Sequence, residues 1–597
     1  MFSVAAGRDH STRAVNWWRS VNAKPHTTQF GWCTILSNHA TEQWTDRTGS
    51  FAIAGHCRWP LGGQAVGGGL KESSALEWVA IGFKEGGIEF LKKLYGSFAF
   101  VLLDNSSRRL VAVCDHFRLS PLYWGLDQCG TLSISDSVDG VLHNQKINEE
   151  FVAGFIVGGS DGTRTIWQGV NQVPGATVVR YQDGKLATER YWRPERLEAV
   201  ATIDAPEAAS EYRRLLDEAV LSSLAVGATT WCDLSGGLDS SSVVSVAAEL
   251  SNNGRTDRRL GGTITFVDTL RDGDDQQLSE GIARQYDLKN LQVVDCWPWK
   301  RDGELPPLSD QPARDYPFFA RNRAVRRVIE KCGGTRLLTG VGPDHALATV
   351  SLHIPDLLWQ GRVARGLREL FSWASLTRQP FLAALFGDAL LPLGPKSLVR
   401  YREMRRAEVP HWLSKDFAAR LSLGQRVAEM RVPVGQRGQM HTAATLKALS
   451  RLSSTIGIWS NLRWPDVGHP FLDVPLIEFS IRLPYHLRTN PRWTKPTLRN
   501  AMTGTLPGRV LHRRTKGDIV ASISRAFYRE RSLFVKLLSH PVLGDFGFIE
   551  PQRLMTAVDA FATRGLGSSR MLLSVLALET WLSRKSGRCD GEYVYIT

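Results

Sequence analysis

Several features that would define other classes of protein are missing from this sequence. It has no run of about 18 apolar residues, so no membrane-spanning helix is expected; the best candidate, 380–391, is too short and contains Asp388. Charged residues at 8–10 interrupt the N-terminal stretch, so it lacks a signal-peptide pattern. The eight cysteines form no C-x-x-C pair, which indicates neither a zinc site nor a disulfide framework. These absences favour a reduced, cytoplasmic protein.

The composition is that of a large globular protein with an unevenly spread positive charge. At 597 residues, with 43% of them apolar, the chain is long enough for more than one domain with a full core. The formal charge is +14, and residues 361–451 hold 16 Lys/Arg against 6 Asp/Glu. That segment is either a solvated helical surface or a face for an acidic peptide, nucleic acid or an anionic membrane. Charge alone does not choose among these alternatives.

Apolar runs and turns predict two kinds of structure along the chain. The N-terminal part is glycine-rich, and four of its apolar runs predict buried strands: 31–36, 51–54, 98–103 and 109–113. A polar stretch at 194–206 predicts a linker. Beyond it, helices alternate with strands: 208–225, 262–267, 276–286 and 291–294. This alternation favours a parallel sheet with its ligand at the carboxyl ends of the strands, and the chain is mostly helical from 351 onward.

The stretch 231–242 carries the strongest chemical signal. An apolar run ends in Ser235-Gly236-Gly237, and a helix rich in hydroxyls follows, beginning with Leu238-Asp239-Ser240. Two glycines, serine hydroxyls and a helix N-terminus together suit phosphate. Asp239 fits such a pocket if it holds Mg²⁺ that bridges to the phosphates. The alternative is an ordinary strand-to-helix turn with a serine cap, and the Gly-Lys-Ser/Thr of a Walker loop is missing.

A second loop repeats this architecture, and a basic stretch complements it. Gly340-Val341-Gly342-Pro343-Asp344 follows another apolar run, although alone it is a weak signal. If both loops end neighbouring strands, Asp239 and Asp344 flank one site and share Mg²⁺. The basic stretch consists of Lys495, Arg499, Arg509, Arg513, Arg514 and Lys516. It is either a surface loop or a group of cations that stabilises a transferred phosphoryl group and a tetrahedral intermediate.

These motifs resemble the glutamine-dependent asparagine synthetase family over nearly the whole chain. Residues 235–240 resemble its ATP loop, and 340–344 its Gly-x-Gly-x-Asp-Glu motif. Four further stretches resemble signatures of the family's synthetase domain: 469–473, 483–484, 495–499 and 514–517. Three stretches resemble signatures of its glutaminase domain: 56–58, 95–100 and 115–123. The resemblance implies a mixed α/β and α+β fold. An Ntn-hydrolase-like αββα domain, glutaminase-like, would span 1–195, and a PP-loop (adenine nucleotide α-hydrolase-like) parallel-sheet synthetase domain with helical additions would span 206–597.

Departures from the family pattern narrow the expected activity. The family's glutaminase uses a cysteine at the mature N-terminus, whereas the second residue here is Phe2. Cys33 could serve only after removal of the preceding 32 residues, so we expect no glutamine hydrolysis and a merely structural Arg58. Val341 stands where asparagine synthetases carry Glu and β-lactam synthetases carry Tyr, and His345 replaces the Glu of the motif. Synthesis of asparagine and closure of a β-lactam are therefore disfavoured.

The branch that remains resembles the lasso-peptide cyclases. By that resemblance the enzyme uses ATP to adenylate an Asp or Glu side chain of a precursor peptide, whose N-terminal amine closes a macrolactam. The residues expected to bind ATP and Mg²⁺ are Leu234, Ser235, Gly236, Gly237, Asp239, Ser240, Val267, Gly340, Gly342 and Asp344. In this set Leu234 and Val267 border the adenine, and Asp239 and Asp344 hold the metal. Lys516, helped by Arg514, would stabilise the charges of adenylation and acyl transfer.

Partners and rival activities follow from the same comparison. The cyclases work with a leader-binding protein and a leader peptidase, and the basic segment 361–451 would dock such a partner or the peptide. No nucleic acid is expected. The same-class alternative is another asparagine synthetase-like or β-lactam synthetase-like ligase acting on a small amino acid; more distant alternatives are a tRNA-modifying pyrophosphatase and an inactive binding module.

Overall fold

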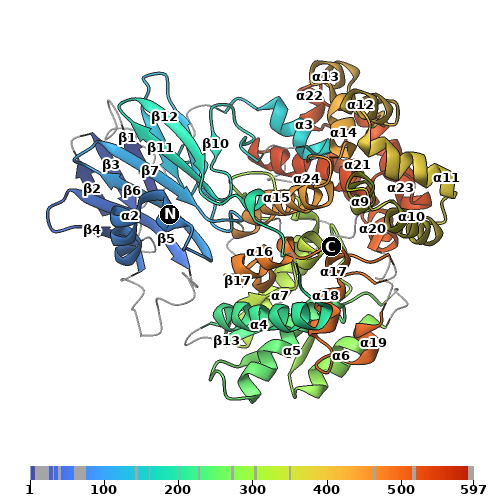
Figure 1. Ribbon diagram of the computed structural model, residues 1–597. Helices are drawn as coiled ribbons and strands as arrows, with labels where there is room; N and C mark the ends of the chain where they lie inside the picture. The colour runs from blue at the N-terminus through green and yellow to red at the C-terminus, as the bar shows by residue number, and fades with distance from the viewer. Residues whose placement is uncertain are drawn as a thin grey trace.

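The protein has an N-terminal pair of antiparallel sheets and a C-terminal parallel sheet with many helices (Figure 1). The computed structural model describes residues 2–6, 26–30, 32–37, 42–58, 75–141, 145–159, 162–200, 202–225, 229–269, 274–300, 306–347, 351–433, 435–461, 466–491, 493–513 and 519–588. Within these ranges, no helix combines the length and apolar character needed to cross a bilayer.

The first sheet has the strand order β10-β8-β9-β1-β3-β2. Its strands are β1 (Phe2–Ala6), β2 (His26–Phe30), β3 (Cys33–Ser37), β8 (Tyr123–Leu126), β9 (Leu132–Ser135) and β10 (Asn171–Gln172). β1 is central: it pairs antiparallel with β3, Val4 opposite Ile35, and with β9, Val4 opposite Ile134. Every residue of β1 is buried, so this strand forms the middle of the domain.

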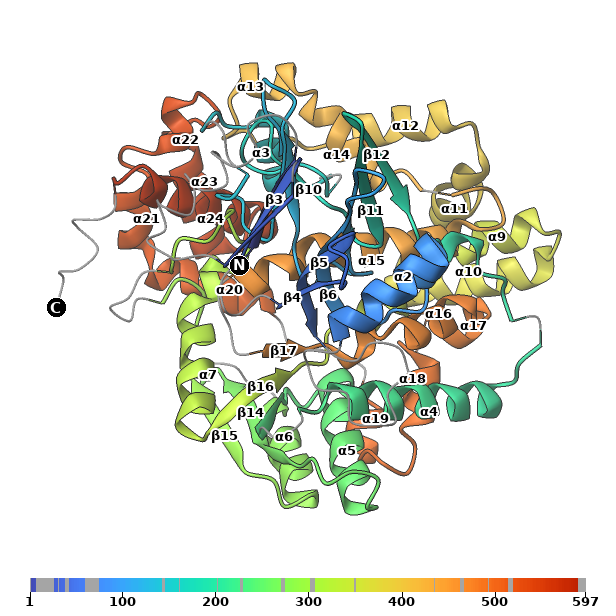
Figure 2. The ribbon, with the colours of Figure 1, turned by 90° about the vertical axis from the view of Figure 1, so that its left-hand side faces the viewer.

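The second sheet faces the first and has the order β12-β11-β7-β6-β5-β4. Its strands are β4 (Glu42–Thr45), β5 (Phe51–Arg58), β6 (Ser97–Asp104), β7 (Arg109–Cys114), β11 (Thr177–Gln182) and β12 (Lys185–Arg190). Alternate residues such as Ala99 and Val101 pack against the first sheet, while Phe98 and Phe100 point to the other face. Helix α2 (Ala75–Leu91) covers that outer face, as Figure 2 shows.

The synthetase part is built on a five-stranded parallel sheet with the order β15-β14-β13-β16-β17. Its strands are β13 (Thr229–Asp233), β14 (Leu260–Val267), β15 (Asn290–Val294), β16 (Gly334–Leu338) and β17 (Asp466–Gly468). The chain moves outward from β13 through β14 to β15, and then returns to the other side of β13 as β16. The strand order therefore reverses at β13, where parallel sheets place their ligands, beyond the carboxyl ends of the strands.

Helices surround the parallel sheet and fill the space between it and the first domain. Those on or near the sheet are α4 (Ala205–Ser223), α5 (Leu238–Asn252), α6 (Asp275–Gln285), α7 (Phe319–Lys331), α8 (Pro343–Ala346), α16 (Val474–Arg482), α17 (Tyr485–Arg488), α18 (Pro496–Ala501) and α19 (Gly508–Leu511). The helical additions are α9 (His353–Trp359), α10 (Val363–Thr377), α11 (Phe381–Ala384), α12 (Lys396–Arg405), α13 (Lys415–Arg420), α14 (Leu423–Arg431) and α15 (Met440–Asn461). The C-terminal helices are α20 (Ile519–Arg529), α21 (Arg531–Leu537), α22 (Val542–Asp545), α23 (Pro551–Arg564) and α24 (Ser569–Lys585).

One continuous core joins the two parts of the chain. Helix α3 (Glu149–Val157) packs beside the first sheet and against α14 and α24, so Tyr123 of the first domain and Trp581 of the last helix belong to one buried cluster. The predicted fold class is confirmed: an Ntn-type antiparallel domain precedes a parallel-sheet synthetase domain with helical additions. The sequence did not predict β1, β8, β9, β10, β11, β12 or the short strands β2, β4 and β17; of these, β2, β4, β10, β12 and β17 lie at sheet edges.

Candidate active site

The loop after β13 leaves its backbone open at the start of α5. Gly236 has a φ of +69°, and a Cβ there would lie 2.6 Å from the carbonyl oxygen of Asp275, so only glycine fits. Gly237 is the N-cap residue of α5, and no side chain caps the helix there. The first N–H groups of α5 therefore point out of the helix without a side-chain acceptor, which is the arrangement that binds phosphate.

Two serine hydroxyls hold this loop together. Ser240 Oγ accepts a hydrogen bond from the Ser235 N–H at 3.0 Å and lies 2.9 Å from Ser235 Oγ. The Gly237 N–H donates to Ser235 Oγ at 3.4 Å. Because Ser240 is buried in the first turn of α5, these bonds fix the loop to the helix and preorganise the N–H groups for a ligand.

The loop after β16 packs directly on the first one. β13 and β16 are parallel neighbours with Trp231 opposite Leu337, so their carboxyl ends coincide. A Cβ on Gly340 would lie only 2.5 Å from the backbone nitrogen of Ser240. Gly342 has a φ of +137°, and a Cβ there would lie 2.8 Å from the Phe471 Cβ. The two predicted glycines of the second loop thus allow close approach of backbones, and Asp344 follows in the first turn of α8.

A lysine ammonium joins the two loop aspartates. Lys495 Nζ lies 2.7 and 2.5 Å from the two carboxylate oxygens of Asp239 and 2.6 Å from Asp344 Oδ1. The lysine side chain is only 6% exposed, whereas that of Asp344 is 54% exposed. The structure therefore brings the two aspartates together, with Lys495 between them where the sequence predicted Mg²⁺.

The donor set fits a magnesium ion that also binds phosphate. Two carboxylates converge on one cation, and carboxylate oxygens are the ligands that Mg²⁺ prefers. The described part of the chain contains no group of three or more His, Cys, Asp or Glu placed to hold a metal. A magnesium ion held by Asp239 and Asp344 would therefore complete its coordination with water or nucleotide oxygens.

A cavity of 180 Å³ lies beyond the ends of β14 and β15. Val267, the last residue of β14, lines it, together with Phe266 and Arg321. Arg321 stacks on Phe266, with its guanidinium carbon 4.6 Å from the ring centre. Burial raises the pKa of Asp233 to about 6, and the positive charge of Arg321 partly opposes this rise. Val267 is thus placed where a flat ligand group can be accepted.

The second residue predicted at the adenine, Leu234, has its side chain in the core. It is fully buried among the helices packed on the sheet. Its N–H donates to the Ile264 carbonyl at 2.8 Å, and its carbonyl accepts from the Thr265 hydroxyl at 2.9 Å. The Leu234 side chain, N–H and carbonyl all have partners within the protein. The role of Leu234 at the adenine therefore stays a prediction.

Two arginines of the basic stretch, Arg499 and Arg513, lie near the first loop but have different contacts. Arg513 Nη1 lies 2.5 Å from Asp275 Oδ1, next to Gly236. Arg499 has a structural role instead, because its guanidinium donates to the carbonyls of Thr494 and Arg513. Residues 514–518 lie outside the described residues, and with them the predicted catalytic pair, Arg514 and Lys516.

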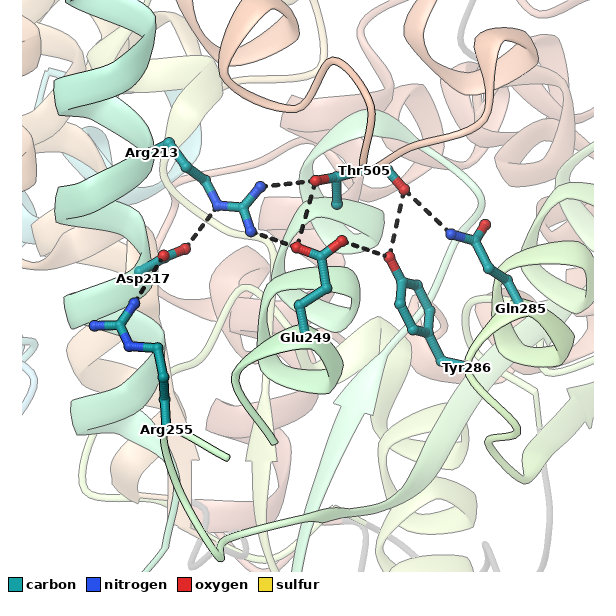
Figure 3. A network of polar contacts seen from close by, with 7 residues as sticks. All are labelled: Arg213, Asp217, Glu249, Arg255, Gln285, Tyr286 and Thr505. Atoms are coloured by element: carbon teal, nitrogen blue, oxygen red, sulfur yellow. Dashed lines mark hydrogen bonds and ion pairs between the residues drawn. The ribbon is translucent and has the colours of Figure 1, made fainter. Parts of the chain in front are cut away.

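A network of polar contacts fixes the helices behind the site (Figure 3). Arg213 of α4 donates to Glu249 of α5 at 2.5 Å and to the Thr505 hydroxyl at 2.7 Å. Tyr286 and Gln285, at the end of α6, donate to the Thr505 carbonyl at 3.4 and 3.3 Å. Thr505 follows α18, which begins directly after Lys495, so the network holds the lysine segment in register with α5.

The glutaminase position in the first domain is apolar. Phe2 is fully buried, its N–H donates to Asp136 Oδ1 at 2.9 Å, and its ring packs near His56. Cys33 is also fully buried, on β3, and burial raises the pKa of its thiol. Phe2 has no thiol, and the buried thiol of Cys33 is not an exposed thiolate, which is the form of cysteine that attacks a carbonyl group. The side chain of Arg58 lies outside the described residues.

Sequence reasoning missed the role of Lys495. It appeared only as one cation of a basic stretch, although its motif matched the family. Its side chain contacts Asp239 across 256 residues of chain, and no local pattern reveals such a contact. The available signal was the Lys-x-x-Leu-Arg pattern at 495–499, which offers a lysine that could pair with the two loop aspartates.

The family to which this chain belongs is one of ATP-dependent ligases that form carbon–nitrogen bonds. A family model described as asparagine synthase matches residues 211–583, and one described as a glutamine amidotransferase domain matches residues 64–192. The chain therefore belongs to the asparagine synthase family. Members of this family use ATP, typically with Mg²⁺, so the protein is an enzyme of that kind.

Individual relatives are distant. A Mycobacterium tuberculosis (strain H37Rv) protein named as a glutamine-hydrolyzing asparagine synthetase is 24% identical over 476 residues, or 73% of this chain and 69% of its own. Asparagine synthetase B of Escherichia coli (strain K12) is 28% identical over 28% of this chain and 25% of its own. Amidase chyE of Penicillium rubens is 30% identical over 48% of this chain and 44% of its own.

Proposed function

We propose that the protein is an ATP-dependent macrolactam synthetase that closes a lasso-type ring in a precursor peptide. The enzyme would adenylate an Asp or Glu side chain of the peptide and release pyrophosphate. The peptide's N-terminal amine would then attack the acyl carbon, forming an isopeptide bond and expelling AMP. The observation that carries the proposal is buried Phe2, because a synthetase that lacks a glutaminase nucleophile needs an amine from elsewhere.

The residues of the two loops would bind and orient ATP. The N–H groups of Gly236 and the first turn of α5, with the hydroxyls of Ser235 and Ser240, would hold the phosphates. Asp239 and Asp344 would hold magnesium, which when bound neutralises phosphate charge. Lys495 would keep the two carboxylates in place, and Lys516 with Arg514 would stabilise the charge that develops during adenylation and acyl transfer.

We assign no general base for ring closure. An acyl-adenylate is already reactive, so holding a neutral amine against it supplies much of the acceleration. The exposed Val341 leaves the second loop without an acid or a phenol at that position. This supports a substrate that places its own amine beside the acyl-adenylate through its folded shape, without help from a catalytic dyad.

A peptide substrate is supported by the size of the helical additions and by their charge. The additions from α9 to α15 supply the basic segment 361–451, which suits an acidic peptide or a leader-binding protein. A leader peptidase would be the other partner, and a reaction that consumes ATP is expected in the cytoplasm. Membership of the family does not distinguish this reaction from a ligase acting on a small amino acid.

The test is ATP–pyrophosphate exchange with two sets of substrates. A precursor peptide encoded beside this gene should drive exchange and yield AMP and a product lighter by one water. Replacing its acceptor Asp or Glu by the amide should abolish exchange, whereas acetylating its N-terminus should preserve exchange but prevent ring formation. If free aspartate drives ATP–pyrophosphate exchange and the peptide does not, the proposal is wrong and the protein is a ligase for a small amino acid.

A further inference from the structure

The helical additions expose an unusual amount of apolar surface. Helices α10, α11 and α12 lie at the side of the molecule opposite the N-terminal sheets (Figure 1). Of the 22 exposed large apolar residues in the described chain, 12 fall between residues 359 and 404. We call these residues the apolar edge: Trp359, Val363, Leu367, Phe371, Leu376, Phe381, Leu382, Phe386, Leu390, Leu398, Tyr401 and Met404. A concentration of this kind marks an interaction surface, unlike single exposed residues.

Helix α10 carries two apolar stripes, of which only one serves the fold. Leu370 and Ala374 are buried against α9 and α11. Val363, Leu367 and Phe371 recur at every fourth residue on another face and are exposed, Phe371 at 64%. The exposed stripe contributes little to the core, so its apolar character needs another explanation.

The segment that follows, 380–393, is the longest nearly unbroken apolar stretch of the additions. An apolar stretch of about 10–14 residues is ordinarily either part of a core or an interfacial segment. Only the small residues Ala384 and Ala389 of this stretch are buried, whereas Leu382 and Phe386 are 65% and 63% exposed. Its one acid, Asp388, is partly buried, next to Gly387, whose carbonyl accepts a hydrogen bond from Arg402. The acid therefore does not interrupt the apolar edge.

The surroundings of the apolar edge are basic. Residues 359–406 contain nine Lys/Arg and three Asp/Glu. Arg368, Lys396 and Arg405 are exposed among the apolar residues. Long basic side chains can reach phosphate groups while neighbouring Phe and Leu side chains enter the acyl region, which is the composition of helices that lie in a membrane interface.

We propose that the apolar edge is a peripheral membrane-binding surface for bilayers that contain anionic phospholipid. The helices would lie in the plane of the interface, with Phe371, Leu382 and Phe386 among the acyl chains and the basic side chains at the headgroups. Charge complementarity favours this occupant, as does the spread of apolar residues over several successive helical segments rather than in one groove. The proposal is independent of the peptide reaction.

Vesicle flotation of the full-length protein tests the proposal. We expect flotation with phosphatidylcholine vesicles that contain phosphatidylglycerol, weaker flotation with phosphatidylcholine alone, and release by high salt. The triple variant Phe371→Ser/Leu382→Ser/Phe386→Ser should lower the partition coefficient by about a hundredfold, since each buried apolar side chain adds to binding. Arg368→Glu/Lys396→Glu/Arg405→Glu should remove the preference for phosphatidylglycerol.

A matched triple elsewhere on the surface is the control. Tyr528→Ser/Phe546→Ser/Leu566→Ser removes exposed apolar groups of similar size from the C-terminal helices and should leave flotation unchanged. The idea is overturned if the parent protein does not float with either vesicle, or if the control triple reduces flotation as strongly. It is equally overturned if light scattering shows a dimer that the first triple converts to a monomer, because the apolar edge would then bind a second copy of the chain.

Discussion

The two domains of this chain bury different kinds of side chain where the family resemblance places their reactions. In the first domain, Phe2 stands where the resemblance leads us to expect the glutaminase nucleophile, and its side chain is fully buried. At the synthetase position a lysine and two aspartates stay in contact, with Lys495 almost fully buried. Buried ion pairs are seldom the most stable way to fill a space, because desolvation costs about as much as their attraction returns. The contrast supports the proposal that the reaction takes place in the synthetase domain.

The first domain has nevertheless been retained as part of the structure. Asp310, which precedes α7, accepts hydrogen bonds from the Ser137 hydroxyl and the Val138 N–H of the first domain. Trp192 donates to Glu478 of α16 at 2.7 Å. With the shared core around α3 and α24, these contacts make the first domain a support for the synthetase part.

The largest expected difference between the domains comes from Asp239→Asn. The variant keeps the shape of the side chain but removes a charge that contacts Lys495, so pyrophosphate exchange should fall at least about a thousandfold. The control is Asp257→Asn, at an exposed position after α5. Exchange within threefold of the parent in Asp239→Asn would show that Asp239 is not needed for adenylation.

Gly340→Ala should have the second-largest effect on pyrophosphate exchange. The added methyl group would meet the Ser240 nitrogen at 2.5 Å, so the two loops must separate, and exchange should drop by roughly a hundredfold with a loss of about 1–3 kcal/mol in stability. Gly281→Ala in α6 has nothing within 4 Å and should instead stabilise the helix slightly. Equal effects of the two substitutions on exchange kinetics would contradict the close approach of the loops.

Phe2→Ala should affect stability and leave chemistry alone. Removing a fully buried ring costs about 3–5 kcal/mol, which a urea titration followed by tryptophan fluorescence would detect. Exchange activity at low temperature should equal that of the parent, and Phe546→Ala, at an exposed ring, is the control. A tenfold loss of activity in folded Phe2→Ala would mean that the first domain still takes part in the reaction.

The smallest expected effect is a change in pH dependence from Asp473→Asn. Burial raises the pKa of Asp473 to about 7, whereas an unfolded aspartate has a pKa near 4. The folded protein therefore holds this proton more tightly, and the free energy of unfolding falls as pH rises from about 4 to about 7. Asparagine keeps the N-cap of α16 without titrating.

The variant should accordingly be more stable than the parent by roughly 1–4 kcal/mol at pH 8, with no difference at pH 4. Urea unfolding at both pH values measures this, and Asp204→Asn, at the exposed N-cap of α4, controls for the change of cap. A difference that is the same at both pH values would rule out the buried carboxyl group as its source.

Burial explains only part of how far the sequence predicts the fold, because the central and fully buried strand β1 was missed together with several edge strands. Central strands such as β14 and β6 are packed on both faces, so they are continuous apolar runs that a sequence reveals. β2, β4 and β17 lie at sheet edges and carry polar residues such as His26, Glu42 and Asp466. An edge strand has few apolar contacts to make, so its sequence contains little periodic signal.

The site is predictable to the extent that it is local. The glycine positions in both loops, and the strand-to-helix turns around them, follow from the chain itself because φ angles and helix starts are local properties. The contact of Lys495 with both aspartates and the stacking of Arg321 on Phe266 depend on how distant segments pack. The domain boundaries and the roles of Arg514 and Lys516 stay predictions.

The contact between Gly340 and the Ser240 amide has a consequence for how this enzyme can change. Since neither loop has room to move independently, a substitution in one alters the fitness of substitutions in the other. Epistasis should therefore be strong between 235–240 and 339–344 and weak between either loop and the first domain. A directed-evolution library aimed at a different nucleotide or acyl acceptor would need to randomise both loops at once.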